Sequence, residues 1–537
     1  LPAAERQHRS IWAAYMLGRL AATPEEATQR FRMVRKLAAE GFSDSQDMCD
    51  ASWGWEARAY LDHEQYAEAA DLYLRHYQTG APSALNSLRM VMQKVFTQSR
   101  YDYLADDLFD DFARDATARR LWTAYLLSLG TDRYYWDEEY NQQVLHACQR
   151  WVKTLNAEDI TSIDEYGSFA WLAYKSGDTQ LAKEWLALAP PDAEVASWIA
   201  AKIAQREGNL ALAAHSLQKA LKEPELSPYH RLIYAELGRV ELALDEPQKA
   251  LTAWLLGGHW EDAAYIAERV LSTDELVAYV NDRLDAVVDE SMSTNHESLP
   301  DTLSRSWTNY YARVLQENRK NLRNLLARRL MRESRFDEAL PYFDEATRPE
   351  ADRYLALVRS AYDSNHPAEN RAAAFWIAAV LTREHGMELF GTELFPDNVI
   401  WWGSFVYLGD PTAIRQELAR YERGPLAPTR NELQRIEEHT VPDQRFHYRY
   451  RAATLGGWAA ALLPNDSEDT ADVLYTAGSW LKYRDPHAAQ PFYQALVIRC
   501  PHTPLGQAAA KAKWFPSDKF AFTDHTYAPD LPAAQEP

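Results

Sequence analysis

The feature that most constrains this chain is a set of small residues that recur at a fixed interval. Gly208 lies 31 residues after Gly177, and Ala213 lies 31 residues after Ala182. Two markers that share one interval indicate an internal repeat, and a repeat of this length holds one pair of helices. Because glycine and alanine let two helix axes approach closely, these positions predict the contact points of helical hairpins.

The remaining sequence also has a helical character. Glycine is scarce, at 20 of 537 residues, and the alternation of Val, Ile and Thr that marks strands is rare. Ala, Leu, Glu and Arg dominate segments of helical period. We therefore expect an all-α fold.

The repeated pattern is clearest in WGWEARAYLDHEQYAEAADLYLRHY, residues 53–77. Its large and small positions are Trp53, Ala57, Tyr60, Tyr66, Ala69 and Tyr73. This spacing resembles the tetratricopeptide repeat, in which small residues mark the closest approach of two antiparallel helices and large ones fill the gaps between hairpins. Degenerate copies follow at 166–189, 197–221, 234–257, 325–346 and 481–501, and an irregular one at 11–31.

The resemblance implies a superhelical array of antiparallel helix hairpins, a TPR-like α-solenoid with a concave surface. A segment rich in Ser, Thr and Asn at 288–307 predicts a division of the array. We expect TPR-like repeats over 1–290, further helical repeats with an aromatic-rich insertion over 291–515, and an extended or disordered tail over 516–537.

Composition excludes several classes of protein. The chain has 57 basic and 78 acidic side chains, a net charge of -21, which disfavours nucleic acid as a partner. No apolar run is long enough to predict a transmembrane segment. The cysteines and histidines show no metal-ligand spacing, so we expect no metal or cofactor. The chain starts without Met, which favours a periplasmic or cell-surface location over the cytoplasm.

The stretch HGMELFGTELFPDNVIWWGSF, residues 385–405, departs from the repeat. We expect Gly386 to close the preceding apolar helix in a left-handed conformation, with further breaks at Gly391 and Pro396. Its large apolar side chains must be buried against something, since exposing each would forgo roughly 1.5 to 3 kcal/mol.

Two interpretations of this stretch stay open. It is either a plug that packs on its own scaffold or a loop that recognises a partner. In the second case the aromatic anchors are Trp401, Trp402 and Tyr407, and the polar contacts are His385, Glu388, Glu393 and Asp397.

No phosphate loop, dinucleotide fingerprint or metalloprotease motif occurs in the sequence. ESRF, residues 333–336, is similar to the catalytic stretch of lytic transglycosylases, but it falls at the turn of a repeat hairpin. Asp106, Asp107, Asp110 and Asp111 are spaced three and four apart, so at least two of these carboxylates share a helix face, which favours a hydrated acidic surface over a cation site.

We therefore expect a non-catalytic scaffold that binds a protein or peptide of basic or neutral character within a larger assembly. The aromatic content of 12% supports an alternative, a carbohydrate-binding cell-surface protein. A helical glycan-active enzyme is the third reading, and it would need two carboxylates about 5 to 10 Å apart in an aromatic cleft.

Overall fold

The computed structural model of the chain describes residues 2–99, 106–129, 138–160, 165–190, 195–222, 229–293, 301–393, 396–397, 399, 411–421, 424–438 and 445–530. Within these ranges the regular structure is entirely helical, without a strand, so the all-α prediction is confirmed for this part of the chain. The chain divides into two compact units, Leu1–Ile203 and Ala204–Pro537. The boundary expected near residue 290 falls within the second unit.

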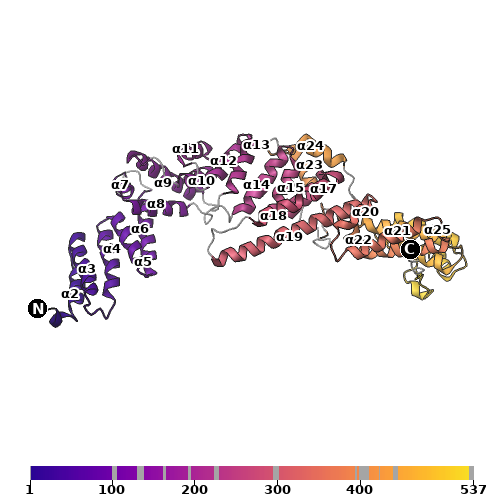
Figure 1. Cartoon of the computed structure of the whole chain (residues 1–537), viewed down its shortest axis with the longest axis horizontal. Coiled ribbons are helices and arrows are strands. Elements are labelled where there is room, and N and C mark those ends of the chain that lie inside the picture. The colour runs from indigo at the N-terminus through magenta and orange to yellow at the C-terminus, as the bar shows by residue number, and fades with distance from the viewer. Residues whose placement is uncertain are drawn as a thin grey trace. The chain divides into compact units, whose positions relative to one another are not determined.

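Unit 1 contains the helices from α1 to α11 and most of α12, whose last residues belong to unit 2 (Figure 1). Their bounds are α1 Ala3–Arg6, α2 Ser10–Arg19, α3 Pro24–Ala39, α4 Met48–Asp62, α5 Tyr66–Gln78, α6 Ser83–Ser99, α7 Asp106–Arg114, α8 Ala116–Leu129, α9 Glu138–Ala157, α10 Tyr166–Lys175, α11 Thr179–Leu188 and α12 Ala196–Arg206. Helices α2 to α6 stand side by side, each packed on the next (Figure 1).

Small residues lie where the helices of a hairpin meet. A Cβ placed on Gly18 of α2 would come within 2.8 Å of the Phe31 ring of α3, so only glycine fits there. In the next hairpin, α4 and α5 bury Ala57 and Ala69 completely. The spacing of small and large residues in the sequence thus coincides with the seams between helices.

Two hairpin turns that lie 31 residues apart have the same local geometry. Gly177 and Gly208 both have positive φ, 90° and 76°, which glycine adopts at no steric cost. The next residue caps the following helix in each case: Asp178 accepts a hydrogen bond from the backbone N–H of Leu181, and Asn209 accepts one from that of Leu212.

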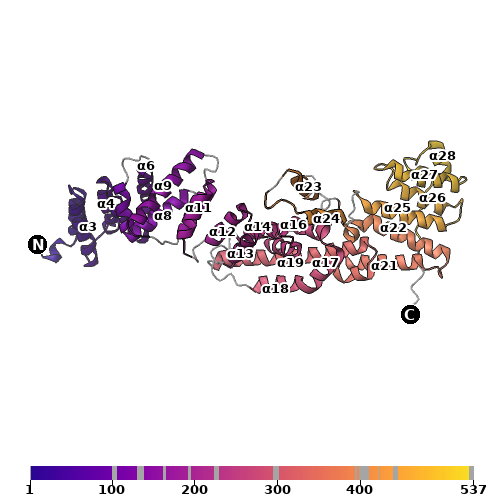
Figure 2. The ribbon, with the colours of Figure 1, turned by 90° about the horizontal axis from the view of Figure 1, so that it is seen from above.

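Unit 2 contains the remaining helices (Figure 2). Their bounds are α13 Leu210–Ala220, α14 His230–Ala243, α15 Pro247–Gly257, α16 Trp260–Tyr265, α17 Thr273–Tyr279, α18 Asp285–Ser293, α19 Asp301–Arg332, α20 Phe336–Ala339, α21 Arg348–Tyr362, α22 Ala368–Phe390, α23 Pro411–Tyr421, α24 Arg430–Glu438, α25 His447–Leu462, α26 Glu468–Ser479, α27 Pro486–Arg499 and α28 Pro504–Ala512. Its described residues also form the π-helical turns η3 Ile266–Val270 and η4 Val280–Leu284 and the 3₁₀ turns η5 Leu340–Tyr342 and η7 Lys519–Ala521.

The long helix α19 connects the two ends of unit 2, because it packs on α15 to α18 and also reaches α22 (Figures 1 and 2). Small residues again mark the seams: a Cβ on Gly238 of α14 would lie 2.4 Å from the indole nitrogen of Trp254 in α15. The copy at 325–346 is shorter than its resemblance implies, since α20 stops at Ala339. Pro341 follows in the 3₁₀ turn η5 and cannot continue a helix.

The expectation for the end of α22 is wrong. The helix is interrupted at His385, where φ is -114° and ψ is 22°, but it resumes and ends at Phe390, followed by Gly391 with a φ of 74°. Gly386 lies inside the helix, and a Cβ there would come within 2.4 Å of the Tyr448 ring in α25. This glycine therefore permits close helix packing and does not cap the helix.

Other predictions concern the chain as a whole. No helix in the described ranges is long and apolar enough to cross a membrane. Cys49, Cys148 and Cys500 are unpaired thiols, and the last two are buried. Of the predicted tail, residues 516–530 are described, and apart from one 3₁₀ turn they form no helix.

Candidate functional site

An open cavity of about 640 Å³ lies in unit 1 along α3, α4, α5 and the end of α7. We call it the groove. Its lining contains four arginines, five carboxylates and two aromatic rings: Arg32, Arg35, Arg75, Arg114, Glu56, Glu68, Asp71, Asp111, Asp115, Trp53 and Tyr60. Few apolar side chains take part, so polar and stacking contacts dominate its chemistry.

A buried carboxylate fixes one side of the groove. Glu56 of α4 is 1% exposed and forms an ion pair with Arg35 of α3. Arg35 also donates to Ser52 Oγ at 3.0 Å, and its guanidinium carbon lies 3.9 Å from the centroid of the Trp53 ring. Three contacts thus hold this guanidinium in one orientation, which makes this part of the groove preformed.

The arginines on the rim are held more loosely. The Arg32 side chain is 73% exposed, and its Nε lies 4.0 Å from Glu56. Arg75 pairs with Asp71 at 2.8 Å, also at an exposed position. Exposed pairs of this kind contribute about 0 to 1 kcal/mol, so a ligand carboxylate can replace the internal partner at little cost.

The predicted acidic face contributes to the same groove. Asp111 lines it, and both Asp110 and Asp111 lie within 4 Å of the guanidinium of Arg114. Arg114 also bonds Glu158 at 2.9 Å. No group of three or more potential metal ligands occurs in the described ranges, and these carboxylates are instead paired with a cation.

The groove residues were only partly recognisable in the sequence. Trp53 and Tyr60 appear there as repeat positions, and Asp111 as part of an acidic face, but the arginines were missed. Arg32 and Arg35 each follow a buried residue of α3, Phe31 and Val34, with a spacing of three. A basic face beside an apolar one was the available signal.

The loop residues predicted to contact a partner lie elsewhere, in unit 2. His385 and Glu388 are half-buried at the end of α22, and Oε2 of Glu388 has no hydrogen-bond partner among the described residues. Glu393 and Asp397 are 4% and 3% exposed. Trp401, Trp402 and Tyr407 lie outside the described residues.

The two buried carboxylates of this loop are paired internally. Asp397 forms an ion pair with Arg328 of α19, and Glu393 lies 3.5 Å from Arg445. Burial raises the pKa of both carboxyls, and the neighbouring arginines oppose this rise. In this arrangement the two carboxylates attach the loop to its own scaffold and face no solvent.

Arg328 belongs to a larger buried ionic cluster around α19. Arg332 donates two hydrogen bonds of 2.6 Å to Glu268 of η3 and one of 2.7 Å to the carbonyl of Phe390. Arg329 lies 3.8 Å from the same Glu268 carboxylate. The cluster joins the π-helical turn, α19 and the end of α22.

The backbone beyond α22 is strained where the cluster contacts it. Gly391, Thr392 and Glu393 have φ of 74°, 73° and 85° in succession, a region that side chains other than glycine rarely adopt. His447 bonds the carbonyl of Gly391 at 2.9 Å through Nε2. Burial lowers the pKa of His447 to about 4, so the ring is neutral near pH 7 and Nε2 carries the donated proton.

These contacts favour a structural role for the cluster, because its charged side chains pair with one another and hold a strained loop in place. The groove of unit 1 differs, because it is open and its exposed arginines form only loose ion pairs within the protein. No family model matches the chain, and no curated protein is detectably similar to it in sequence.

Proposed function

We propose that the protein is a non-catalytic interaction scaffold that binds an extended polypeptide in the groove of unit 1. The observation that carries this proposal is the groove itself, a preformed polar cavity built from α3, α4, α5 and the end of α7. Preformed surfaces lose little conformational freedom on binding, which favours association. The resemblance to tetratricopeptide repeats supports a superhelical arrangement of these hairpins and the same kind of function.

The chemistry of the groove suits a polypeptide of mixed charge. The exposed guanidiniums of Arg32 and Arg75 can bind carboxylates, while Glu68, exposed in the first turn of α5, can bind a basic side chain. Because the cavity contains both positive and negative side chains, we expect them to fix the position of an extended chain in the groove more than they raise its affinity.

A charge reversal in the groove tests this function. We expect the full chain, used as bait in its native source, to retain a reproducible partner that the Arg32→Glu/Arg75→Glu variant loses. Arg58→Glu is the control, since Arg58 is also an exposed arginine, on α4, but does not line the groove. Recovery of the same proteins by all three baits would refute the proposal.

A second candidate, carbohydrate binding, has one specific observation in its favour. In unit 2, Tyr362, Phe375 and Trp458 form a three-ring cluster with centroids 5.2 to 5.9 Å apart. Tyr362 is 56% exposed and Trp458 44%, so their faces are available for stacking on sugars. Binding to immobilised glycans that Trp458→Ala abolishes would favour this alternative. The predicted periplasmic or cell-surface location fits either function and stays a prediction.

A further inference from the structure

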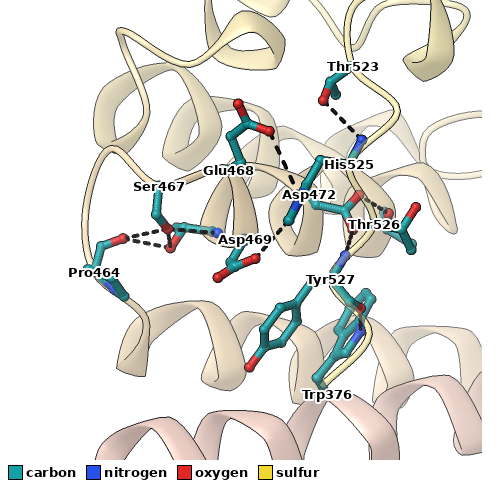
Figure 3. Close-up of polar contacts among 12 residues, drawn as sticks. Trp376, Pro464, Ser467, Glu468, Asp469, Asp472, Thr523, His525, Thr526 and Tyr527 are labelled. Carbon is teal, nitrogen blue, oxygen red and sulfur yellow. Dashed lines mark hydrogen bonds and ion pairs between the residues drawn. The ribbon is translucent and has the colours of Figure 1, made fainter. Parts of the chain in front are cut away.

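The end of the described chain crosses unit 2 as an extended segment. Phe515 is buried over Gly478 of α26, where a Cβ would lie 2.2 Å from the Phe515 ring, and Tyr475 donates to the carbonyl of Pro516 at 2.9 Å. Residues 517–530, which we call the strap, continue from this anchor across α26 to α22 (Figure 3).

The strap is held through its backbone at one aromatic residue. The N–H of Tyr527 donates to Asp472 of α26 at 2.6 Å, and its carbonyl accepts from the indole N–H of Trp376 of α22 at 2.8 Å (Figure 3). Trp376 itself is fixed by stacking on Trp480, with centroids 5.7 Å apart. Backbone recognition of this kind accepts many sequences.

Basic side chains of the strap meet carboxylates of α26. Lys519 forms an ion pair with Asp472. His525 lies 2.7 Å from Asp469 and 4.0 Å from Glu468 (Figure 3). The start of α26 therefore presents carboxylates to the two basic side chains of the strap, which also carries Asp518, Asp524 and Asp530 and so has no net positive charge.

The strap is weakly buried. No residue in 517–530 is fully buried, and Phe520 and Phe522 are 70% and 47% exposed. Beyond 522, half-buried positions alternate with exposed ones, as in an extended peptide that lies on a surface. Since apolar burial supplies most of the free energy of packing, a segment that packs one ring, Tyr527, against Trp376 and is otherwise held by polar contacts is easily displaced.

The surface beneath the strap needs an occupant. Asp472 is 1% exposed, and outside the strap it accepts a hydrogen bond of 3.3 Å from the hydroxyl of Thr476. A buried carboxylate that loses its cation and its N–H donor is costly, so exchange of one segment for another is favoured over an empty surface.

We propose that Trp376 of α22 with Glu468, Asp469 and Asp472 of α26 forms a second peptide-binding site, which takes an extended segment of a partner protein that carries a basic side chain, and which the strap occupies in its absence. The bound segment presents a basic side chain to Asp472 and the backbone of an aromatic residue to Trp376. This site is separate from the groove of unit 1 and does not depend on the function proposed for it.

Proline substitutions in the full chain test the proposal, with a labelled synthetic peptide of residues 517–530 as the probe. Tyr527→Pro removes the N–H that bonds Asp472 and so loosens the strap. We expect this variant to bind the probe about tenfold more tightly than the unchanged chain, because apparent affinity scales with the fraction of molecules whose site is open. Ala528→Pro is the matched control and should bind the probe like the unchanged chain.

A second substitution locates the probe. Asp469→Asn changes a partly exposed residue of α26, and combined with Tyr527→Pro it should weaken binding of the probe. Arg32→Glu/Arg75→Glu, combined with Tyr527→Pro in the same way, should leave binding of the probe unchanged. The proposal is overturned if Tyr527→Pro and Ala528→Pro bind the probe equally or not at all, or if Asp469→Asn has no effect.

Discussion

Two adjacent glycines of α25 should respond in opposite ways to alanine. A Cβ on Gly456 would lie 2.9 Å from the Cβ of Ala477 in α26, closer than such atoms come in proteins. A Cβ on Gly457 would have its nearest neighbour at 3.5 Å, in the ring of Phe492, which is an ordinary contact. The two sites share one helix and differ in the space beside them.

The magnitude follows from two opposing effects. Either substitution gains about 1 kcal/mol, because alanine favours the helix over glycine. At Gly456 the added methyl group meets a methyl group fixed to the backbone of α26, so the two helices must separate, and overpacking of this kind costs roughly 1 to 3 kcal/mol. We expect Gly457→Ala to stabilise unit 2 by about 1 kcal/mol, and Gly456→Ala to be roughly 1 to 3 kcal/mol less stable than it.

Hydrogen exchange of the α25 and α26 amides in the full chain measures this difference directly, since it reports the stability of unit 2 separately from that of unit 1. Protection of these amides should be higher in Gly457→Ala than in the unchanged chain, and lower in Gly456→Ala than in Gly457→Ala. If Gly456→Ala were as protected as Gly457→Ala, the argument that glycine is required by helix contact at this seam would fail.

Three further results are expected. The pKa of His447 falls from 6.5 to about 4 on folding, so between these pH values only the unfolded chain binds the proton. The stability that the neutral ring contributes is therefore complete above pH 6.5 and declines by up to roughly 3 kcal/mol towards pH 4. His447→Gln should flatten that part of a plot of thermal midpoint against pH. Glu268→Gln leaves the buried Arg329 and the half-buried Arg332 without this counter-charge and should cost about 3 to 5 kcal/mol in denaturant unfolding. The exposed control Glu338→Gln should cost much less, and equal losses would contradict the burial argument. Gly386→Ala should destabilise unit 2 by at least about 1 kcal/mol, because the new Cβ meets the base of the Tyr448 ring, and an unchanged thermal midpoint would show that α22 and α25 can part freely.

The segment 385–405 shows how far a sequence pattern carries. The break in the helix and the need to bury its apolar side chains follow from local chemistry. Which glycine ends the helix does not, because Gly386 and Gly391 look alike in sequence, and only the position of Tyr448 decides that Gly386 stays helical. The burial of Glu393 and Asp397 depends on Arg445 and Arg328, each more than 50 residues away along the chain.

The sequence by itself determined the helices and many of the seams between them. Helical periodicity and the spacing of small residues act over one or two turns, so Gly177 could be matched with Gly208, and Ala182 with Ala213, from the sequence alone. These properties are local, because they depend on side-chain size and on backbone preferences within a single hairpin.

Only the tertiary structure decided where the charges meet. The groove combines side chains of four helices, the ionic cluster pairs Glu268 with Arg332, and the strap brings Lys519 to Asp472. The local sequence around each of these side chains does not distinguish it from a charged residue on the surface. Whether a charge is exposed or buried beside its partner depends on distances between segments remote in the sequence, and those distances are fixed by how whole helices pack.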